Sequence, residues 1–140
     1  MTRRICVVIP ILAITAVTLF ACALFTPAEQ DLIVKITARR LAAHGAKSFP
    51  VIFAELGKTA RNACDRPGET MAPSDALELI AQSIGLQLED PLLAADLKDL
   101  AQLLGIRFDP AFKLIGVTPE QERRIKIAVC SFAQGVELYP

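Results

Sequence analysis

The sequence is poor in the residues that most active sites need. It has a single histidine, His44, no tryptophan, and only two cysteines outside an N-terminal apolar run, Cys64 and Cys130. One histidine excludes a zinc site built on several histidines, and no spacing supports a nucleophilic pair of His44 with either cysteine. His44 precedes Gly45, where the carbonyl end of a helix would favour its positive form. We therefore expect a residue at a helix end, and no metal centre.

Glycine and unbalanced charge are also lacking. The seven glycines are scattered and never gather into a phosphate-binding loop, so we expect no nucleotide or other cofactor. The 15 basic residues equal the 15 acidic ones, and no basic stretch is concentrated enough to neutralise a phosphate backbone. Nucleic acid is therefore not an expected partner.

The sequence does contain an uncharged apolar run, residues 5–25, directly after Arg3 and Arg4. In a helix this run would span about 30 Å, the thickness of the hydrocarbon core of a bilayer. The arginines before it, with no positive charge directly after it, predict a cytoplasmic N-terminus and export of the rest. We expect residues 1–25 to be a signal sequence or membrane anchor. Residues 26–140 would form an extracytoplasmic domain at the inner or outer membrane of a bacterium, facing the periplasm or the cell exterior.

Three fates are open to this run. Residues 19–22 resemble the lipobox of bacterial lipoproteins, in which Cys22 would be lipidated, although Phe20 departs from the usual small residue. Ala21 and Ala23 also match a signal peptidase site with cleavage after Ala23. Without either cleavage the run stays as a single-pass anchor. We favour an anchor, retained or lipidated, over free release.

The rest of the chain carries repeated helix start and stop signals. Residues 26–29 and 118–121 are capping boxes with proline at the first helical position. Apolar spacing and caps predict helices over about 26–45, 49–64, 73–85, 90–105 and 118–135, with a short turn at 109–112. Only residues 86–88 and 136–138 look strand-like. The predicted fold class is all-α, with an N-terminal hydrophobic helix followed by a small four- or five-helix bundle.

Cys64 and Cys130 are candidates for a disulfide, because an exported domain meets an oxidising compartment. Closing a loop of this length would stabilise the fold by roughly 4 kcal/mol in the chain-entropy model. The alternative is two buried thiols that act as small hydrophobic side chains.

Charge is unevenly placed along the domain. Residues 39–66 are locally basic, whereas residues 69–99 are acidic. The basic stretch could contact lipid head groups or an acidic patch of a partner, or the two segments could be complementary faces of one bundle. Candidate partner contacts are Arg39, Arg40 and Arg61, with apolar residues expected outside the core, namely Phe49, Phe53 and Tyr139.

Two segments carry a resemblance. Residues 35–42, KITARRLA, and residues 90–105, DPLLAADLKDLAQLLG, resemble a pattern in small helical proteins of tailed phages and prophages that often carry a membrane segment. The resemblance implies a phage or prophage accessory protein at the bacterial envelope, in lysis control or superinfection exclusion. It supplies no catalytic residues.

The predicted function is binding of another envelope protein, and we do not expect an enzyme. One alternative is a small cell-wall hydrolase that uses a Glu/Asp pair as acid and base. Its candidates would be Glu55, Glu69, Glu78, Glu89, Asp90, Asp96 and Asp99, all on predicted polar helix faces or caps. A second alternative is a structural component that self-associates. The sequence leaves the oligomeric state open.

Overall fold

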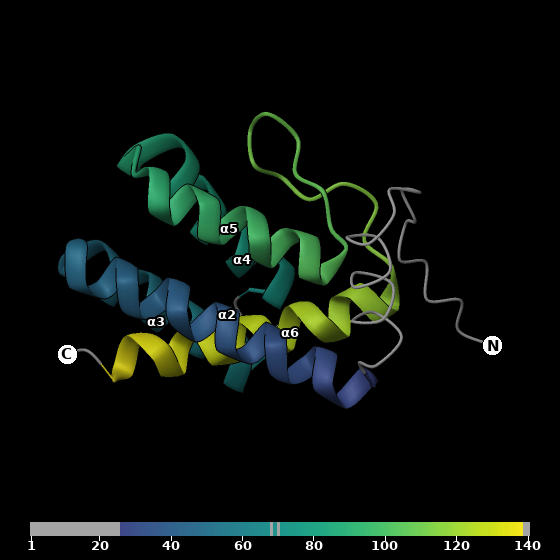
Figure 1. Cartoon of the computed structure of the whole chain (residues 1–140). Helices are drawn as coiled ribbons and strands as arrows, with labels where there is room; N and C mark the ends of the chain where they lie inside the picture. The colour runs from purple at the N-terminus through teal and green to yellow at the C-terminus, as the bar shows by residue number, and fades with distance from the viewer. Residues whose placement is uncertain (1–25, 68, 70, 139–140) are drawn as a thin grey trace, which may run out of the picture.

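Helices form nearly all the regular structure in the computed structural model, which describes residues 26–67, 69 and 71–138. They are α2 (Pro27–Ser48), α3 (Pro50–Asp65), α4 (Pro73–Gln82), the π-helix η1 (Ser83–Leu88), α5 (Pro91–Leu104) and α6 (Pro119–Glu137) (Figure 1). The described residues hold no strand, only an isolated antiparallel bridge between Phe108 and Leu114. The all-α prediction is confirmed for this part of the chain. The predicted hydrophobic helix, residues 5–25, lies outside the described residues.

Proline opens every α-helix of the described part, and side-chain caps complete most of these starts. The Thr26 hydroxyl accepts a hydrogen bond from the Glu29 amide, and the Glu29 carboxylate accepts one from the Thr26 amide. Thr118 and Gln121 form the same reciprocal pair at α6. Both predicted capping boxes are therefore confirmed. They satisfy amide groups that the first turn of a helix leaves unpaired.

Helix α6 lies at the centre of the bundle and contacts α2, α3, α4 and α5. Its buried residues cover a wide arc, because neighbours pack on it from several sides: Ile125, Ala128, Val129, Ser131, Phe132, Ala133, Gly135 and Val136. A helix covered on one side only would bury a single stripe of residues. The core is therefore organised around the last helix of the chain.

Helices α2 and α6 run side by side in the same direction (Figure 1). Near their N-termini Arg123 Nη1 lies 3.1 Å from Asp31 Oδ2, and further along Arg39 Nη2 donates to Gln134 Oε1 at 2.9 Å. Since each bond joins residues at similar distances from the two helix starts, the helices are parallel. Small residues let them approach closely: a Cβ at Gly135 would lie 2.8 Å from the Cβ of Ala42.

Three predicted helix ends are wrong. Helix α2 continues past Gly45 to Ser48, α6 continues past Gly135 to Glu137, and the helix expected to stop at Gly85 widens into η1. At each place the glycine makes room for a close neighbour: the Phe53 ring at Gly45, α2 at Gly135 and the Phe112 ring at Gly85. The predicted end at Gly105 is confirmed, with φ of +67° at the C-cap.

One residue expected outside the core lies at its centre. Phe53 is fully buried, and its ring centroid is 5.8 Å from that of Phe132 on α6. Phe49, expected outside with it, is partly buried against the core, and Tyr139 lies outside the described residues. The prediction of Phe53 as a contact residue is therefore wrong.

The two segments that look strand-like in the sequence are not strands. Residues 86–88 belong to η1, and residues 136–138 end α6 or follow it directly.

Candidate functional site

An apolar groove runs along α5, between this helix, η1 and the loop 105–118. We call it the α5 groove, and it has a volume of about 570 Å³. Its lining residues are Ile84, Gly85, Glu89, Asp90, Pro91, Ala94, Leu97, Lys98, Ala101, Phe108 and Phe112. The volume lies within the range of about 300–1,000 Å³ found for small-molecule sites, so the groove is large enough to take bulky side chains.

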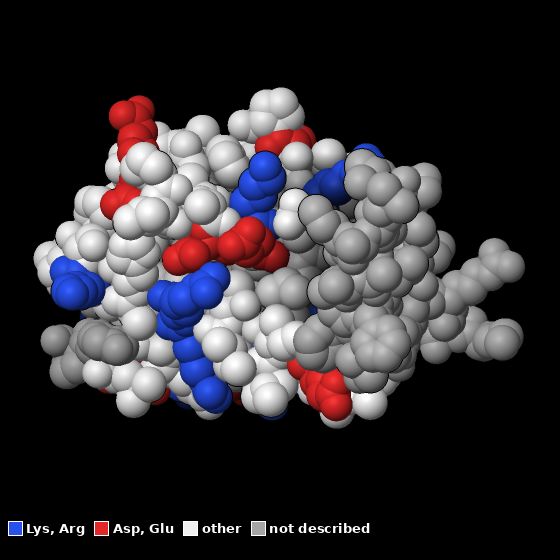
Figure 2. Space-filling model, in the orientation of Figure 1, with Lys and Arg blue, Asp and Glu red and all other residues white. Residues whose placement is uncertain are grey.

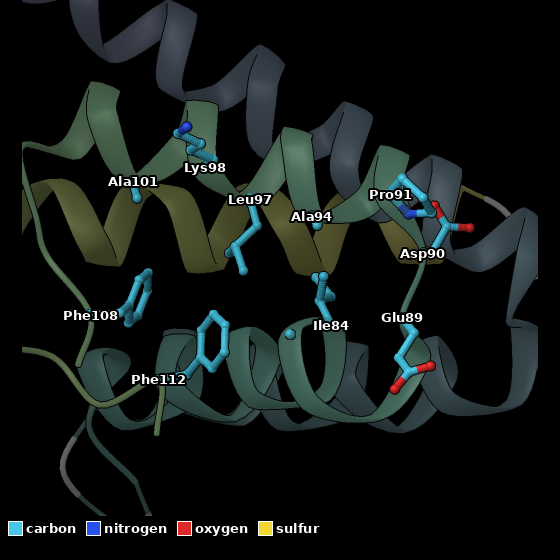
Figure 3. A pocket seen from close by; sticks show the side chains of 11 residues that line it. Ile84, Glu89, Asp90, Pro91, Ala94, Leu97, Lys98, Ala101, Phe108 and Phe112 are labelled. Carbon is cyan, nitrogen blue, oxygen red and sulfur yellow. The ribbon is translucent and has the colours of Figure 1, made fainter. Parts of the chain in front are cut away.

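The walls of the α5 groove come from three elements. Leu97 on α5 and Ile84 on η1 point toward each other across it, and the rings of Phe108 and Phe112 lie at one end (Figure 3). The ring centroids are 6.1 Å apart, a normal distance for a tilted aromatic pair. On α5 the small side chains of Ala94 and Ala101 lie one turn before and after Leu97, so this stretch of the helix stays open.

The carboxylate of Asp109 shapes the loop that carries Phe112. Asp109 Oδ1 accepts hydrogen bonds from the amides of Ala111 at 2.8 Å and Lys113 at 2.9 Å. The Phe112 amide donates to the Asp109 carbonyl, so the chain turns tightly between the two aromatic residues. The predicted turn at 109–112 is confirmed. The turn places Phe108 and Phe112 on the side of the loop that lines the α5 groove.

Backbone strain is concentrated at this groove. Among the described residues, two non-glycine residues have positive φ, Glu89 at 48° and Phe112 at 59°, and both line the α5 groove. A bulky residue in this region of backbone space is an outlier. Such strain is usually found where structure serves binding or catalysis, because the surrounding contacts must hold it in place. The Phe112 ring is held against Gly85, whose missing side chain leaves the space for it.

The opposite end of the groove is acidic. Asp90 Oδ1 accepts from the amides of Leu92 and Leu93, which leaves Oδ2 without a hydrogen bond from any described residue. The side chain of Glu89 is exposed beside it (Figure 3). Neither Glu89 nor Lys98, on the outer rim, forms an ion pair with another described residue. The partial positive charge at the start of α5 offsets only about half of one unit charge, so this end stays negative.

A second hollow of about 600 Å³ lies between α3 and the end of α6. It is no smaller than the α5 groove, but its walls are chemically different. Arg61 and Glu137 line it and bind each other, and its apolar residues are small, with no aromatic ring among them. We choose the α5 groove as the candidate site because strained backbone and aromatic rings meet only there among the described hollows.

The predicted disulfide is present. Cys64 at the end of α3 is bonded to Cys130 on α6, with Cα atoms 5.2 Å apart and 66 residues apart in sequence. It fixes α3 to the central helix on a part of the molecule that does not line the α5 groove. Cys22, the predicted lipidation site, lies outside the described residues.

The three arginines predicted as partner contacts do not come together. Arg39 reaches Gln134 on α6, and Arg40 lies 3.3 Å from Asp96 on α5. Arg61 Nε lies 2.8 Å from Glu137 Oε1 near the C-terminal end of α6. On the face shown in Figure 2, basic and acidic side chains lie next to one another. Between α2 and α5, Arg40 joins the basic segment to Asp96 and Asp99 of the acidic segment. The role of the arginines in partner binding stays a prediction.

Two ion pairs are strong enough to shift pKa values. The hydrogen bond from Arg61 lowers the pKa of Glu137, and the same bond raises the pKa of Arg61. The hydrogen bond from Arg123 likewise lowers the pKa of Glu120. Both pairs are well exposed, so they contribute modestly to stability. They stabilise the charged form of each carboxylate, the opposite of what a general acid needs.

Most of the carboxylates considered for a hydrolase have structural partners. Glu55 pairs with Lys58, Glu69 with Arg66, and Asp99 with Arg40. Asp96 lies between Arg40 and His44, whose Nδ1 is 3.6 Å away. His44 is inside α2 rather than at its end, so this carboxylate, not the helix terminus, is its partner. Glu78 lines a small hollow with Asp75 on α4.

Neither a metal cluster nor a membrane-spanning helix is found in the part of the chain that the structure describes. No three His, Cys, Asp or Glu residues lie close enough there to hold a metal ion. The helices of residues 26–138 do not combine the length and apolar character needed to cross a bilayer.

Sequence reasoning missed the α5 groove. Its aromatic residues, Phe108 and Phe112, flank an Asp-Pro turn, and that turn was the only signal that could have indicated them. The strain at Glu89 carries no sequence signature. Comparison of the chain with models of protein families, with curated proteins and with solved structures finds no significant match.

Proposed function

We propose that the protein is a membrane-associated, extracytoplasmic helical domain that binds another protein at the bacterial envelope. The observation that carries the binding role is the α5 groove, an apolar hollow with two partly buried aromatic rings in its wall and strained backbone. Concave, mostly apolar hollows with a few polar groups at their edge are typical of binding sites. The proposal is for binding and not for catalysis. On the resemblance noted above, the setting would be a phage or prophage accessory role in lysis control or superinfection exclusion.

The disulfide supports the extracytoplasmic setting. Cys64–Cys130 is of a kind that forms and persists in oxidising compartments and is rare in the cytosol of most organisms. The apolar run of residues 5–25 supports attachment to a membrane. The attachment is tested by the intact mass of the chain from bacterial membranes and periplasm, measured without reduction. A full-length chain, or one starting at an acylated Cys22, supports it, whereas a bare chain starting at Leu24 in the periplasm contradicts it.

Binding through the groove is tested with two neighbouring substitutions. Ala94 lines the α5 groove, whereas Ala95 is exposed on the same helix and does not line it. Ala94→Arg fills the groove with a long charged side chain, and Ala95→Arg is the matched control. We expect an envelope protein to co-purify with the wild type and Ala95→Arg but not with Ala94→Arg. Equal co-purification with all three would exclude the groove as the binding surface.

A further inference from the structure

The polarity of the α5 groove identifies the chemistry of its occupant. Resting on the proposed function, we infer that the groove takes an amphipathic helix of the partner protein, with two large apolar side chains seven residues apart and a basic residue at one end. Three observations carry this inference. They are the spacing of the small residues on α5, the aromatic end of the groove and the acidic end opposite it.

The spacing of the small residues sets the length of the contact. Ala94 and Ala101 are two turns apart, roughly 10 Å along the helix axis, with Leu97 between them as a buried floor. A partner helix that lies along α5 presents side chains at the same interval when they are seven residues apart. Large apolar side chains at that interval fill the open spaces above both alanines. A leucine or phenylalanine there would pack on Ala94 at one position, above the buried Ile84, and would contact Phe108 at the other.

The charges of the groove set the direction of the helix. Glu89 and Asp90 lie at the start of α5, and the aromatic residues lie toward the other end (Figure 3). Each carboxylate has oxygen atoms free of bonds to other described residues, so a lysine or arginine can bind there without breaking an existing pair. Lys98 stands on the rim with its ammonium group pointing away from the two rings (Figure 3). A basic residue is therefore favoured only at the Glu89–Asp90 end.

The test uses two designed peptides and the full chain in lipid nanodiscs. Both peptides are 14-residue Ala/Gln-based helices with leucines at positions 4 and 11, and each carries a fluorescein label at one terminus. At the opposite terminus one peptide ends in Lys-Lys and the other in Glu-Glu, and this is their only difference. Binding is measured by fluorescence anisotropy at low salt, because exposed charge pairs are screened by added ions.

Three variants give the comparison. Glu89→Gln with Asp90→Asn removes both charges, and asparagine keeps the helix cap because it caps as well as aspartate. Ala94→Arg blocks the groove, and Ala95→Arg is its control. We expect the Lys-Lys peptide to bind the wild type roughly tenfold more tightly than the Glu-Glu peptide. The charge-removed variant should bind the two peptides within about twofold of each other, and Ala94→Arg should bind neither.

Other outcomes overturn the inference. Equal affinity of the wild type for both peptides would show that the occupant needs no basic residue at one end. Binding in the groove would still be supported if Ala94→Arg abolished the binding of both peptides. If neither peptide binds, the occupant is not a helix of this kind. The proposed function is then tested by co-purification of the envelope protein alone. A lipid that native mass spectrometry finds on the wild type but not on Ala94→Arg would identify an acyl chain as the occupant. A dimer that Ala94→Arg dissociates would identify a second copy.

Discussion

The Cys64–Cys130 disulfide should account for a large share of the stability of this domain. The bond closes a loop across 66 positions, from the end of α3 to the middle of α6. In the chain-entropy model a loop of this length restricts the unfolded chain by about 4 kcal/mol at 25 °C. Small domains are usually stable by only about 5–15 kcal/mol, so the loss would be evident in any unfolding experiment.

The perturbation is the double variant Cys64→Ala with Cys130→Ala, which removes the bond without leaving a thiol that could form new disulfides. Unfolding of the full chain by urea is followed by far-UV circular dichroism, because the chain has no tryptophan to report by fluorescence. The variant and the wild type are both unfolded in the same detergent. We expect the free energy of unfolding of the variant to be lower by about 4 kcal/mol. The midpoint of thermal unfolding should fall by roughly 15 °C for a domain of this size.

A fall of less than about 1 kcal/mol would refute the reasoning from loop closure. Two free thiols from Cys64 and Cys130, found in the denatured protein without reduction, would refute the disulfide itself. These two results differ in meaning. The first result would mean that the bond exists but contributes little to the free energy of unfolding. The second would mean that the bond is absent, and it would also remove the main support for an oxidising compartment.

Three further predictions follow from the packing and the charges. Phe53→Ala should lower the free energy of unfolding by about 3–5 kcal/mol because the ring is fully buried, whereas Val51→Ala, at an exposed position of the same helix, should change it by under about 0.5 kcal/mol; urea unfolding measures both. Asp109→Ala should lower the free energy of unfolding by about 1 kcal/mol, because two exposed amides exchange their carboxylate acceptor for water. It should also weaken binding of the Lys-Lys peptide several-fold; unchanged peptide binding would show that this turn does not shape the groove. The pKa of Glu137 is lowered in the folded state by Arg61, so its contribution is fully present above its ordinary pKa and is lost as the pH falls through the lowered value. Stability measured from pH 7 to pH 2 should therefore fall less steeply in Arg61→Gln than in the wild type; identical slopes would show that the pair contributes nothing.

The sequence predicts the helices of this domain well because their starts are marked by local chemistry. Thr26 and Thr118 precede proline and are followed three residues later by a side chain that returns the hydrogen bond, so the signal does not depend on the rest of the fold. The prediction of the disulfide rests on the number of cysteines and on the expected export of the domain. These features depend on a few neighbouring residues or on composition, which is why they can be read without a structure.

Three helix ends and the candidate site could not be predicted because they depend on contacts with neighbouring elements of the fold. Gly45 looks like a helix stop, but its role is to admit the Phe53 ring from the next helix, and nothing near Gly45 indicates this. The same holds for Gly85 and Phe112, which are far apart in sequence and meet only after folding. Phe53 is covered by Phe132 of α6, a contact that the sequence of its own helix does not indicate.

The central claim is that the α5 groove is the surface that binds an envelope protein, and site-specific photo-crosslinking in living bacteria tests it most directly. A photoreactive benzoylphenylalanine is placed at Lys98, on the rim of the groove, or, as a control, at Ala95, which is exposed on the same helix outside it. We predict one discrete adduct with a membrane or periplasmic protein from position 98 and none from position 95. Adducts of equal yield from both positions, or from position 95 alone, would contradict the claim.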